Sequence, residues 1–324
     1  MSKLASIKKP VENEMRRFEG FFNDTLKSDV PLLKIILNYI IRRKGKQMRP
    51  LLVFLSAGLN GPVNESTYIA ATFIELLHTA TLVHDDVVDN AQERRGALSI
   101  NALWNSKIAV LVGDYLLTQG LLISIRENRT DLLELISEAV QAMSEGELLQ
   151  LQKARKLNIT EEVYFQVIKM KTAALIAACT ACGTASVTDN QEKIKTMKEL
   201  GENIGISFQI RDDLLDYRGN GLTGKPEGND IREKKITLPL IHALEQVSGT
   251  EKKRILGIMK EKKKSARQVK EVIDFVTENG GMNYAEMMMD KYRDKAFAIL
   301  DTFPDSEYRR SMQEFIDYTT ARLK

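Results

Sequence analysis

The chain has 324 residues, of which 43 % are hydrophobic, and it carries 47 basic against 44 acidic side chains. It is long enough to bury a core without disulfides, and no uninterrupted apolar stretch approaches the roughly 18 residues that span a membrane. Its 19 glycines and 7 prolines are too few for a collagen-like, disordered or turn-rich all-β protein, and a net charge of +3 requires no nucleic-acid partner. The N-terminal segment MSKLASIKKPVENEMRR has no apolar signal-peptide core, so we expect a cytoplasmic protein.

Apolar residues recur at intervals of three and four along nearly the whole chain, which is typical of amphipathic helices. Segments 64–89 and 99–126 are apolar on most faces, which predicts central helices of a large bundle. The sequence shows no alternating strand pattern, no linker and no low-complexity stretch. It therefore predicts an all-α fold that forms one domain over residues 1–324.

Two acidic clusters share one spacing. Residues 85–89 read Asp-Asp-Val-Val-Asp, and residues 212–216 read Asp-Asp-Leu-Leu-Asp. In each cluster the first and third aspartates lie four residues apart and share a helix face. Two charges 4 Å apart repel by about 1 kcal/mol in water and about 4 kcal/mol at an effective dielectric of 20. Because both clusters lie in apolar helices, they indicate bound cations rather than a solvated helix end.

The donor set narrows the choice of cation. Ligands that are all carboxylates indicate a hard ion, and Mg²⁺ typically takes one or two of them and completes its shell with water and phosphate. Calcium is less favoured because its usual loop motif is missing. A di-iron bundle is an alternative, since Glu75 and His78 form a Glu-x-x-His pair. That site needs a second such pair, and neither His84 nor His242 follows a glutamate by three residues.

Basic residues flank both acidic clusters. The segment Gly45-Lys46-Gln47-Met48-Arg49-Pro50 precedes the first cluster, and Arg94-Arg95-Gly96 follows it. Gly224-Lys225 and Lys234-Lys235 follow the second, and which of the last two lysines points inward is open. Arginine binds phosphate through two nitrogens and lysine acts as a point charge. The arrangement suits two diphosphates, one bound through metal and one directly.

The two cysteines, Cys179 and Cys182, form a CxxC pair in an Ala-rich helical segment. A redox motif needs a βαβ context and a zinc site needs a second pair, and the sequence offers neither. We therefore expect both cysteines to pack as small apolar residues.

Residues 82–89, with Arg94-Arg95-Gly96, resemble the first aspartate-rich motif of the trans-isoprenyl diphosphate synthases, and residues 208–217 resemble the second. The likeness runs from about residue 45 to residue 240 and includes Lys171-Thr172 and Lys235-Ile236-Thr237-Leu238-Pro239. The long-chain, octaprenyl type is the most similar. This resemblance implies a bundle of long helices around a deep central cavity, active as a homodimer.

The resemblance also implies roles for individual residues. Several Mg²⁺ ions would bridge the diphosphate of an allylic substrate, held by Asp85, Asp86, Asp89, Asp212 and Asp216. The same diphosphate would contact basic side chains, namely Arg94, Lys171, Lys225 and Lys235. Isopentenyl diphosphate would bind to Lys46, Arg49, His78 and Arg95. Thr172 and Gln209 would offer oxygen dipoles to the developing carbocation.

The implied reaction is head-to-tail condensation of isopentenyl diphosphate onto an allylic diphosphate such as farnesyl diphosphate. We expect an all-trans product, hexaprenyl or longer, for quinone side chains, because Thr81 and Ala80 before the first aspartate are small. Met143 and Ile136 are candidates for the floor of the product tunnel. Membrane contact would be at most peripheral, for product release.

Three other functions remain as alternatives. A geranylgeranyl or farnesyl synthase would differ only in product length. A terpene cyclase needs no second diphosphate site, so Lys46, Arg49 and Arg95 argue against it. A non-catalytic partner subunit would be free to lose the aspartates, and all six are present.

Overall fold

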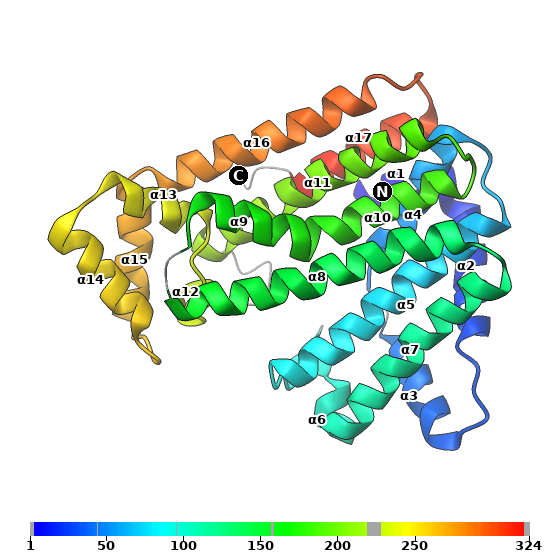
Figure 1. Cartoon of the computed structure of the whole chain (residues 1–324), viewed down its shortest axis with the longest axis horizontal. Helices are drawn as coiled ribbons and strands as arrows, with labels where there is room; N and C mark the ends of the chain where they lie inside the picture. The colour runs from blue at the N-terminus through cyan, green and yellow to red at the C-terminus, as the bar shows by residue number, and fades with distance from the viewer. Residues whose placement is uncertain (1–2, 44, 95, 157–158, 219–227, 321–324) are drawn as a thin grey trace. The chain divides into compact units, whose positions relative to one another are not determined.

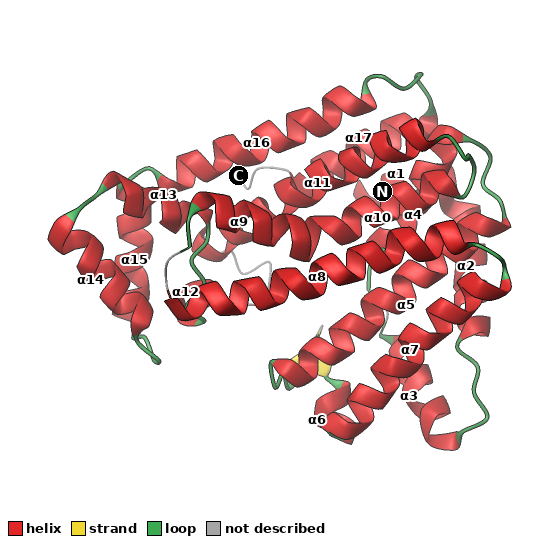
Figure 2. Ribbon diagram, viewed as in Figure 1, coloured by secondary structure: helices red, strands yellow, loops and turns green. Residues whose placement is uncertain are grey.

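The computed structural model describes residues 3–43, 45–94, 96–156, 159–218 and 228–320 (Figure 1). Almost every element in these ranges is a helix, which confirms the all-α prediction (Figure 2). The chain divides into two compact units, which we call the first unit and the second unit. The first unit comprises Met1–Glu138, Ala178–Lys198 and Phe303–Glu314, and the second comprises Ala139–Ala177, Glu199–Thr302 and Phe315–Lys324. That the whole chain forms one domain stays a prediction.

The elements of the first unit are α1 (Lys3–Lys8), η1 (Lys9–Val11), α2 (Glu12–Thr25), α3 (Pro31–Arg42), α4 (Met48–Asn60), α5 (Glu65–Val88), β1 (Glu93–Arg94), β2 (Ala97–Leu98), α6 (Ile100–Trp104) and α7 (Ser106–Arg126). Those of the second unit are α9 (Glu161–Ile168), η2 (Lys169–Ala173), α12 (Asn229–Arg232), α13 (Leu238–Gln246), α14 (Gly249–Lys260), α15 (Ala266–Glu278) and α16 (Gly281–Leu300). Four helices contribute residues to both units, namely α8 (Thr130–Lys156), α10 (Ala174–Ala185), α11 (Gln191–Arg218) and α17 (Glu307–Thr320).

The strands β1 and β2 form an antiparallel hairpin between α5 and α6 (Figure 2). The sequence did not predict them, because strands of two residues are too short to show an alternating pattern. Gly96 lies in the tight connection with a φ of 71°, a conformation that glycine adopts without a steric penalty.

Helix α5 is the central helix of the first unit, as segment 64–89 predicted. Asn64 begins it with a reciprocal capping box to Thr67, and nearly every side chain from residue 67 to residue 78 is buried. It lies against α7 at very close range (Figure 1). A Cβ on Gly113 would lie 2.1 Å from Nε2 of His84, and one on Gly120 would lie 2.4 Å from a ring carbon of Phe73. Because glycine has no side chain, Gly113 and Gly120 allow α5 and α7 to pack this closely.

The prediction for segment 99–126 is wrong in two respects. The helix is interrupted at Asn105, where φ is 77°, and the Asn105 side chain caps α7 by accepting from the Ile108 amide at 3.2 Å. Helix α7 also buries only one stripe, so that Leu111 remains 58 % exposed. By length and composition alone, Ser106–Arg126 and Glu161–Ala185 could each cross a membrane; 33 % and 56 % of their most apolar windows are buried.

The core of the second unit gathers side chains from α9, α11 and α13 to α16, among them Ile210, Leu240 and Val272. Residues beyond about 240, which carry no recognised motif, supply much of this core. A hydrogen bond from Ser207 Oγ to the carbonyl of Met289 at 2.9 Å links α11 to α16.

Cys179 and Cys182 lie in the part of α10 that belongs to the first unit, where both are fully buried and unpaired with each other. Burial raises the pKa of Cys179 to about 12, so its thiol is unreactive at neutral pH. Packing is therefore the role that the structure supports.

Candidate active site

The first aspartate triplet ends α5 in the first unit. Asp85 and Asp89 are exposed, and the Asp89 amide donates to the Asp85 carbonyl at 2.8 Å to close the last turn. Asp86 turns inward and is only 4 % exposed. The triplet thus presents two carboxylates to solvent and keeps the middle one within the protein.

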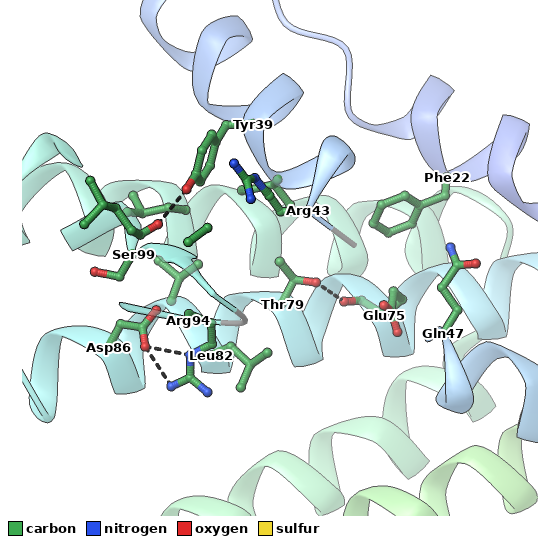
Figure 3. Close-up of a pocket in the computed structure, with 15 residues that line it drawn as sticks. Phe22, Tyr39, Arg43, Gln47, Glu75, Thr79, Leu82, Asp86, Arg94 and Ser99 are labelled. Atoms are coloured by element: carbon green, nitrogen blue, oxygen red, sulfur yellow. Dashed lines mark hydrogen bonds and ion pairs between the residues drawn. The ribbon is translucent and has the colours of Figure 1, made fainter. Parts of the chain in front are cut away.

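Asp86 is held by Arg94. Both Nε and Nη2 of Arg94 lie 2.7 Å from Oδ1 of Asp86 (Figure 3). The hairpin makes this contact possible because it folds β1 back toward the end of α5. Arg94, which the resemblance assigned to the diphosphate, is thus placed beside the triplet, and its contact with substrate stays a prediction.

A pocket of the first unit lies beside this ion pair. Asp86 and Arg94 lie toward one end of the pocket, and Glu75, Gln47 and Phe22 toward the other (Figure 3). Two hydrogen bonds brace its wall: Tyr39 donates to the carbonyl of Leu98 at 2.6 Å, and Thr79 to the carbonyl of Glu75 at 2.7 Å.

Sequence reasoning missed Tyr39, Arg43 and Gln47 as lining residues. Gln47 lies in the basic segment 45–50 that precedes the first acidic cluster. Its φ of 54° at the start of α4 is the kind of strained backbone conformation found at functional sites. Tyr39 and Arg43 come from α3, and no motif points to them.

The predicted isopentenyl diphosphate residues are placed as follows. Lys46 is exposed, Arg49 is half-buried and His78 is buried, while Arg95 lies outside the described residues. The Arg49 and Glu75 charges both act on the buried Cys179 thiol, so these three side chains are neighbours in the first unit. The substrate role of all four stays a prediction.

The second triplet lies on α11 in the second unit and repeats the pattern of the first. Asp212 is exposed, whereas Asp213 is 4 % exposed. The carboxylate oxygens of Asp216 accept from the backbone amides of Asn229 and Asp230 at 3.0 Å each. Asp216 therefore anchors the start of α12, the short helix that carries Asp230, and its predicted metal contact stays a prediction.

Asp213 joins a chain of hydrogen bonds. Tyr164 donates to its Oδ2 at 2.7 Å, and Gln209 Nε2 donates to its Oδ1 at 2.8 Å. The carbonyl oxygen of Gln209 in turn accepts from Thr172 at 2.7 Å. Burial, together with the charge of Asp230, raises the pKa of Asp213 to about 8, although the two donors lower it.

Lys171 and Thr172 lie in η2, a single π-helical turn between α9 and α10. Such turns are rare and concentrate at functional sites. Lys171 Nζ donates to Gln150 Oε1 at 2.8 Å and pairs with Glu147, both on α8. A second pocket opens here, within the second unit. Polar and charged side chains line it, among them Gln150, Tyr164, Lys171, Thr172, Gln209, Asp212, Asp213, Asp230 and Lys235.

The structure answers which of the two adjacent lysines faces this pocket. Lys234 has a φ of 63° and donates to the carbonyl of Lys260, away from the pocket. Lys235 lines the pocket, 3.6 Å from Asp230 and 2.7 Å from Glu233. Burial lowers the pKa of Lys235, but its bond to Glu233 and the nearby carboxylates outweigh that effect and raise it, so Lys235 is charged. Lys225 lies outside the described residues.

Of the predicted chain-length residues, two are buried and two are half-buried. Ala80 is 2 % exposed on α5, and the hydroxyl of half-buried Thr81 donates to the His78 carbonyl at 2.9 Å. Ile136 is buried in the first unit, and Met143 is half-buried in the second. Whether these residues contact a product stays a prediction.

The donor chemistry of both triplets fits a hard metal ion. Within the described parts of the chain, no three His, Cys, Asp or Glu side chains converge into a complete metal site. Mg²⁺ needs only one or two protein carboxylates, because water and phosphate oxygens complete its shell. The side chains of Asp85, Asp89 and Asp212 are exposed, so a hydrated ion can reach them.

Residues 30–276 match the polyprenyl synthetase family. The octaprenyl diphosphate synthase of Escherichia coli (strain K12) is 34 % identical over 311 residues, 95 % of this chain and 96 % of that protein. The structure of a polyprenyl synthase from Caulobacter crescentus CB15, complexed with calcium and isoprenyl diphosphate, has a TM-score of 0.90 and 32 % identity, covering 98 % of each chain. A geranylgeranyl pyrophosphate synthase from Bacteroides thetaiotaomicron has a TM-score of 0.84 and 39 % identity, covering 99 % of this chain and all of that one. This chain belongs to the polyprenyl synthetase family.

Proposed function

We propose that the protein condenses isopentenyl diphosphate head to tail onto an allylic diphosphate, with farnesyl diphosphate as primer, to make a long-chain all-trans polyprenyl diphosphate. The observation that carries this proposal is the repeated triplet, in which the middle aspartate is buried on protein donors and its neighbours are exposed. The similarity to an octaprenyl diphosphate synthase over 95 % of the chain supports it.

The residues have distinct roles in this proposal. The exposed carboxylates Asp85, Asp89 and Asp212 bind Mg²⁺, which when bound neutralises charge on the departing diphosphate. Lys171 and Lys235 bind the same group directly, as fixed positive charges that stabilise it as it leaves. Thr172 and Gln209 direct oxygen atoms toward the carbon that becomes positive. Water must be excluded during the reaction, because it would otherwise quench the cation.

Geranylgeranyl diphosphate is the alternative product. The 39 % identity to a geranylgeranyl pyrophosphate synthase favours it. The small side chains of Ala80 and Thr81 favour a longer product, because they leave room along α5 for a growing tail.

Incubation of the purified protein with radiolabelled isopentenyl diphosphate, farnesyl diphosphate and Mg²⁺ tests both points. We expect products of hexaprenyl length or longer by reversed-phase chromatography. Chelation with EDTA should abolish incorporation, because the carboxylates alone leave the diphosphate charge unbalanced, and excess Mg²⁺ should restore it. Products that stop at geranylgeranyl would overturn the long-chain proposal but not the synthase. No incorporation with any allylic primer would overturn both.

We also propose that the active form is a homodimer that contacts membranes only peripherally and resides in the cytoplasm. The exposed face of α7 supports dimerisation, because Val110, Leu111 and Ile125 are 41 %, 58 % and 54 % exposed. An apolar row of this kind is typical of a protein interface.

Substitution Leu111→Glu should convert the dimer to a monomer, because it places a charge in that apolar row. Light scattering coupled to size exclusion measures the mass in solution. Met287→Glu is the matched control, because the Met287 side chain on α16 is 55 % exposed. This substitution should leave the mass unchanged. A Leu111→Glu protein that stays dimeric would move the interface elsewhere.

A further inference from the structure

Tyr164 belongs to neither aspartate motif, yet its side chain lines the pocket of the second unit. It is 4 % exposed, and its hydroxyl donates to Asp213 Oδ2 at 2.7 Å. Burial, with the Asp213 charge beside it, raises the pKa of Tyr164 well above its usual range. The phenol therefore keeps its proton and remains a donor at any working pH.

Tyr164 donates to one side-chain oxygen of Asp213, and the other oxygen faces Gln209. The amide group of Gln209 turns its NH₂ to Asp213 Oδ1 and its oxygen to Thr172, while the Tyr164 hydroxyl holds the other Asp213 oxygen in place. The Thr172 hydroxyl then commits its single proton to Gln209. Its lone pairs remain for the pocket, where they present negative charge.

The backbone of Thr172 is fixed independently of this chain of bonds. A Cβ on Gly205 of α11 would lie 2.5 Å from Cα of Ala173, and one on Gly146 of α8 would lie 3.0 Å from the Lys171 amide nitrogen. The two glycines let the wide π turn fit between these helices. Packing thus sets where Thr172 lies, and the hydrogen bonds set how its hydroxyl is oriented.

We propose that Tyr164 and Asp213 are positioning residues that lock the Gln209 amide, so that the Thr172 oxygen is oriented in advance toward the developing allylic cation. This inference rests on the proposed function. The advantage is preorganisation: a dipole already aimed at the charge needs no rearrangement when the charge appears. Neither residue needs to touch the substrate.

Substitution Tyr164→Phe tests the proposal, since it removes only the hydroxyl. We expect kcat for condensation to fall by about tenfold to a hundredfold, which is less than the roughly hundredfold to thousandfold loss on removing a preorganised group, because the Thr172 oxygen is misdirected and not removed. KM for both substrates should stay within about twofold, because diphosphate binding does not depend on the Thr172 hydroxyl. Tyr284→Phe is the matched control. Tyr284 also donates to a carboxylate on α9, at 2.8 Å to Glu161, and should keep the wild-type kcat.

A double-variant cycle separates positioning from a loss of stability. If Tyr164 acts through Thr172, the variant Tyr164→Phe with Thr172→Val should lose no more activity than the larger single variant. Asp213→Asn should match Tyr164→Phe, because an amide at this position lets the Gln209 amide turn over. Thermal unfolding of each variant, compared with Tyr284→Phe, accounts for stability.

A wild-type kcat for Tyr164→Phe, or losses that multiply in the double variant, would overturn the inference. These outcomes are distinct from failure of the proposed function, in which the wild-type protein itself would form no polyprenyl product.

Discussion

Asp85→Asn and Asp212→Asn should each lower the rate of condensation by about a thousandfold, equivalent to about 4 kcal/mol of transition-state stabilisation. Both side chains are exposed, so neither substitution should disturb folding. Each removes one negative charge from a Mg²⁺ site at nearly constant shape. Steady-state kinetics at increasing Mg²⁺ should show that each variant needs a higher Mg²⁺ concentration than the wild type for half-maximal activity. A high Mg²⁺ concentration should restore part of the lost rate.

Asp24→Asn is the control for a lost surface carboxylate. Asp24 is exposed on α2 and pairs with Lys27 at 2.8 Å, so its substitution should leave the rate unchanged. Such surface pairs contribute little to stability. Wild-type rates in both Asp85→Asn and Asp212→Asn would refute the metal proposal. A loss in one variant alone would assign the metal to that triplet.

The burial pattern of the triplets shows what spacing predicts and what it does not. A separation of four residues places the first and third aspartates on one helix face, and periodicity alone indicates that. Periodicity does not indicate that the middle aspartate is buried and hydrogen-bonded to protein side chains. Arg94 reaches Asp86 only through the hairpin turn, and Tyr164 reaches Asp213 from 49 residues away along the chain. Contacts of this range depend on tertiary packing, which a local pattern does not contain.

The position of Tyr164 beside Lys171 had a local signal in the sequence, although its contact with Asp213 had none. Tyr164 precedes Lys171 by seven residues, about two helical turns, which places both on one side of a helix. The choice between Lys234 and Lys235 had no such signal. It depends on the left-handed backbone of Lys234, which a lysine adopts rarely and which turns the next residue to the pocket.

The sequence did not predict the exposed face of α7, for a related reason. Composition shows that segment 99–126 is apolar, but it cannot say whether an apolar face is covered by the same chain or by another. The narrow groove at Gly113 and Gly120 accepts α5, and the opposite face of α7 is left exposed. Hydrophobicity therefore overestimated burial for this helix, while for α5 the same reasoning was correct.

Ala80→Phe should shorten the product, from hexaprenyl or longer to about geranylgeranyl length. Ala80 lies five residues before Asp85 on α5 and is 2 % exposed, and its neighbours Thr79, Leu82 and Val83 line the pocket of the first unit. A tail that grows along α5 away from the diphosphate would meet the added ring. Chromatography of products from farnesyl and isopentenyl diphosphates measures the change.

A graded series separates a blocked tail from a strained core. Overpacking a buried site costs about 1 to 3 kcal/mol, so Ala80→Phe alone could lower activity through stability. Ala80→Val and Ala80→Leu add intermediate volume, and a blocked tail predicts that product length falls stepwise with side-chain volume while the primer is still consumed. Strain predicts slower synthesis of a product of unchanged length. That second result, with folded protein by thermal unfolding, would show that the tail does not grow past residue 80.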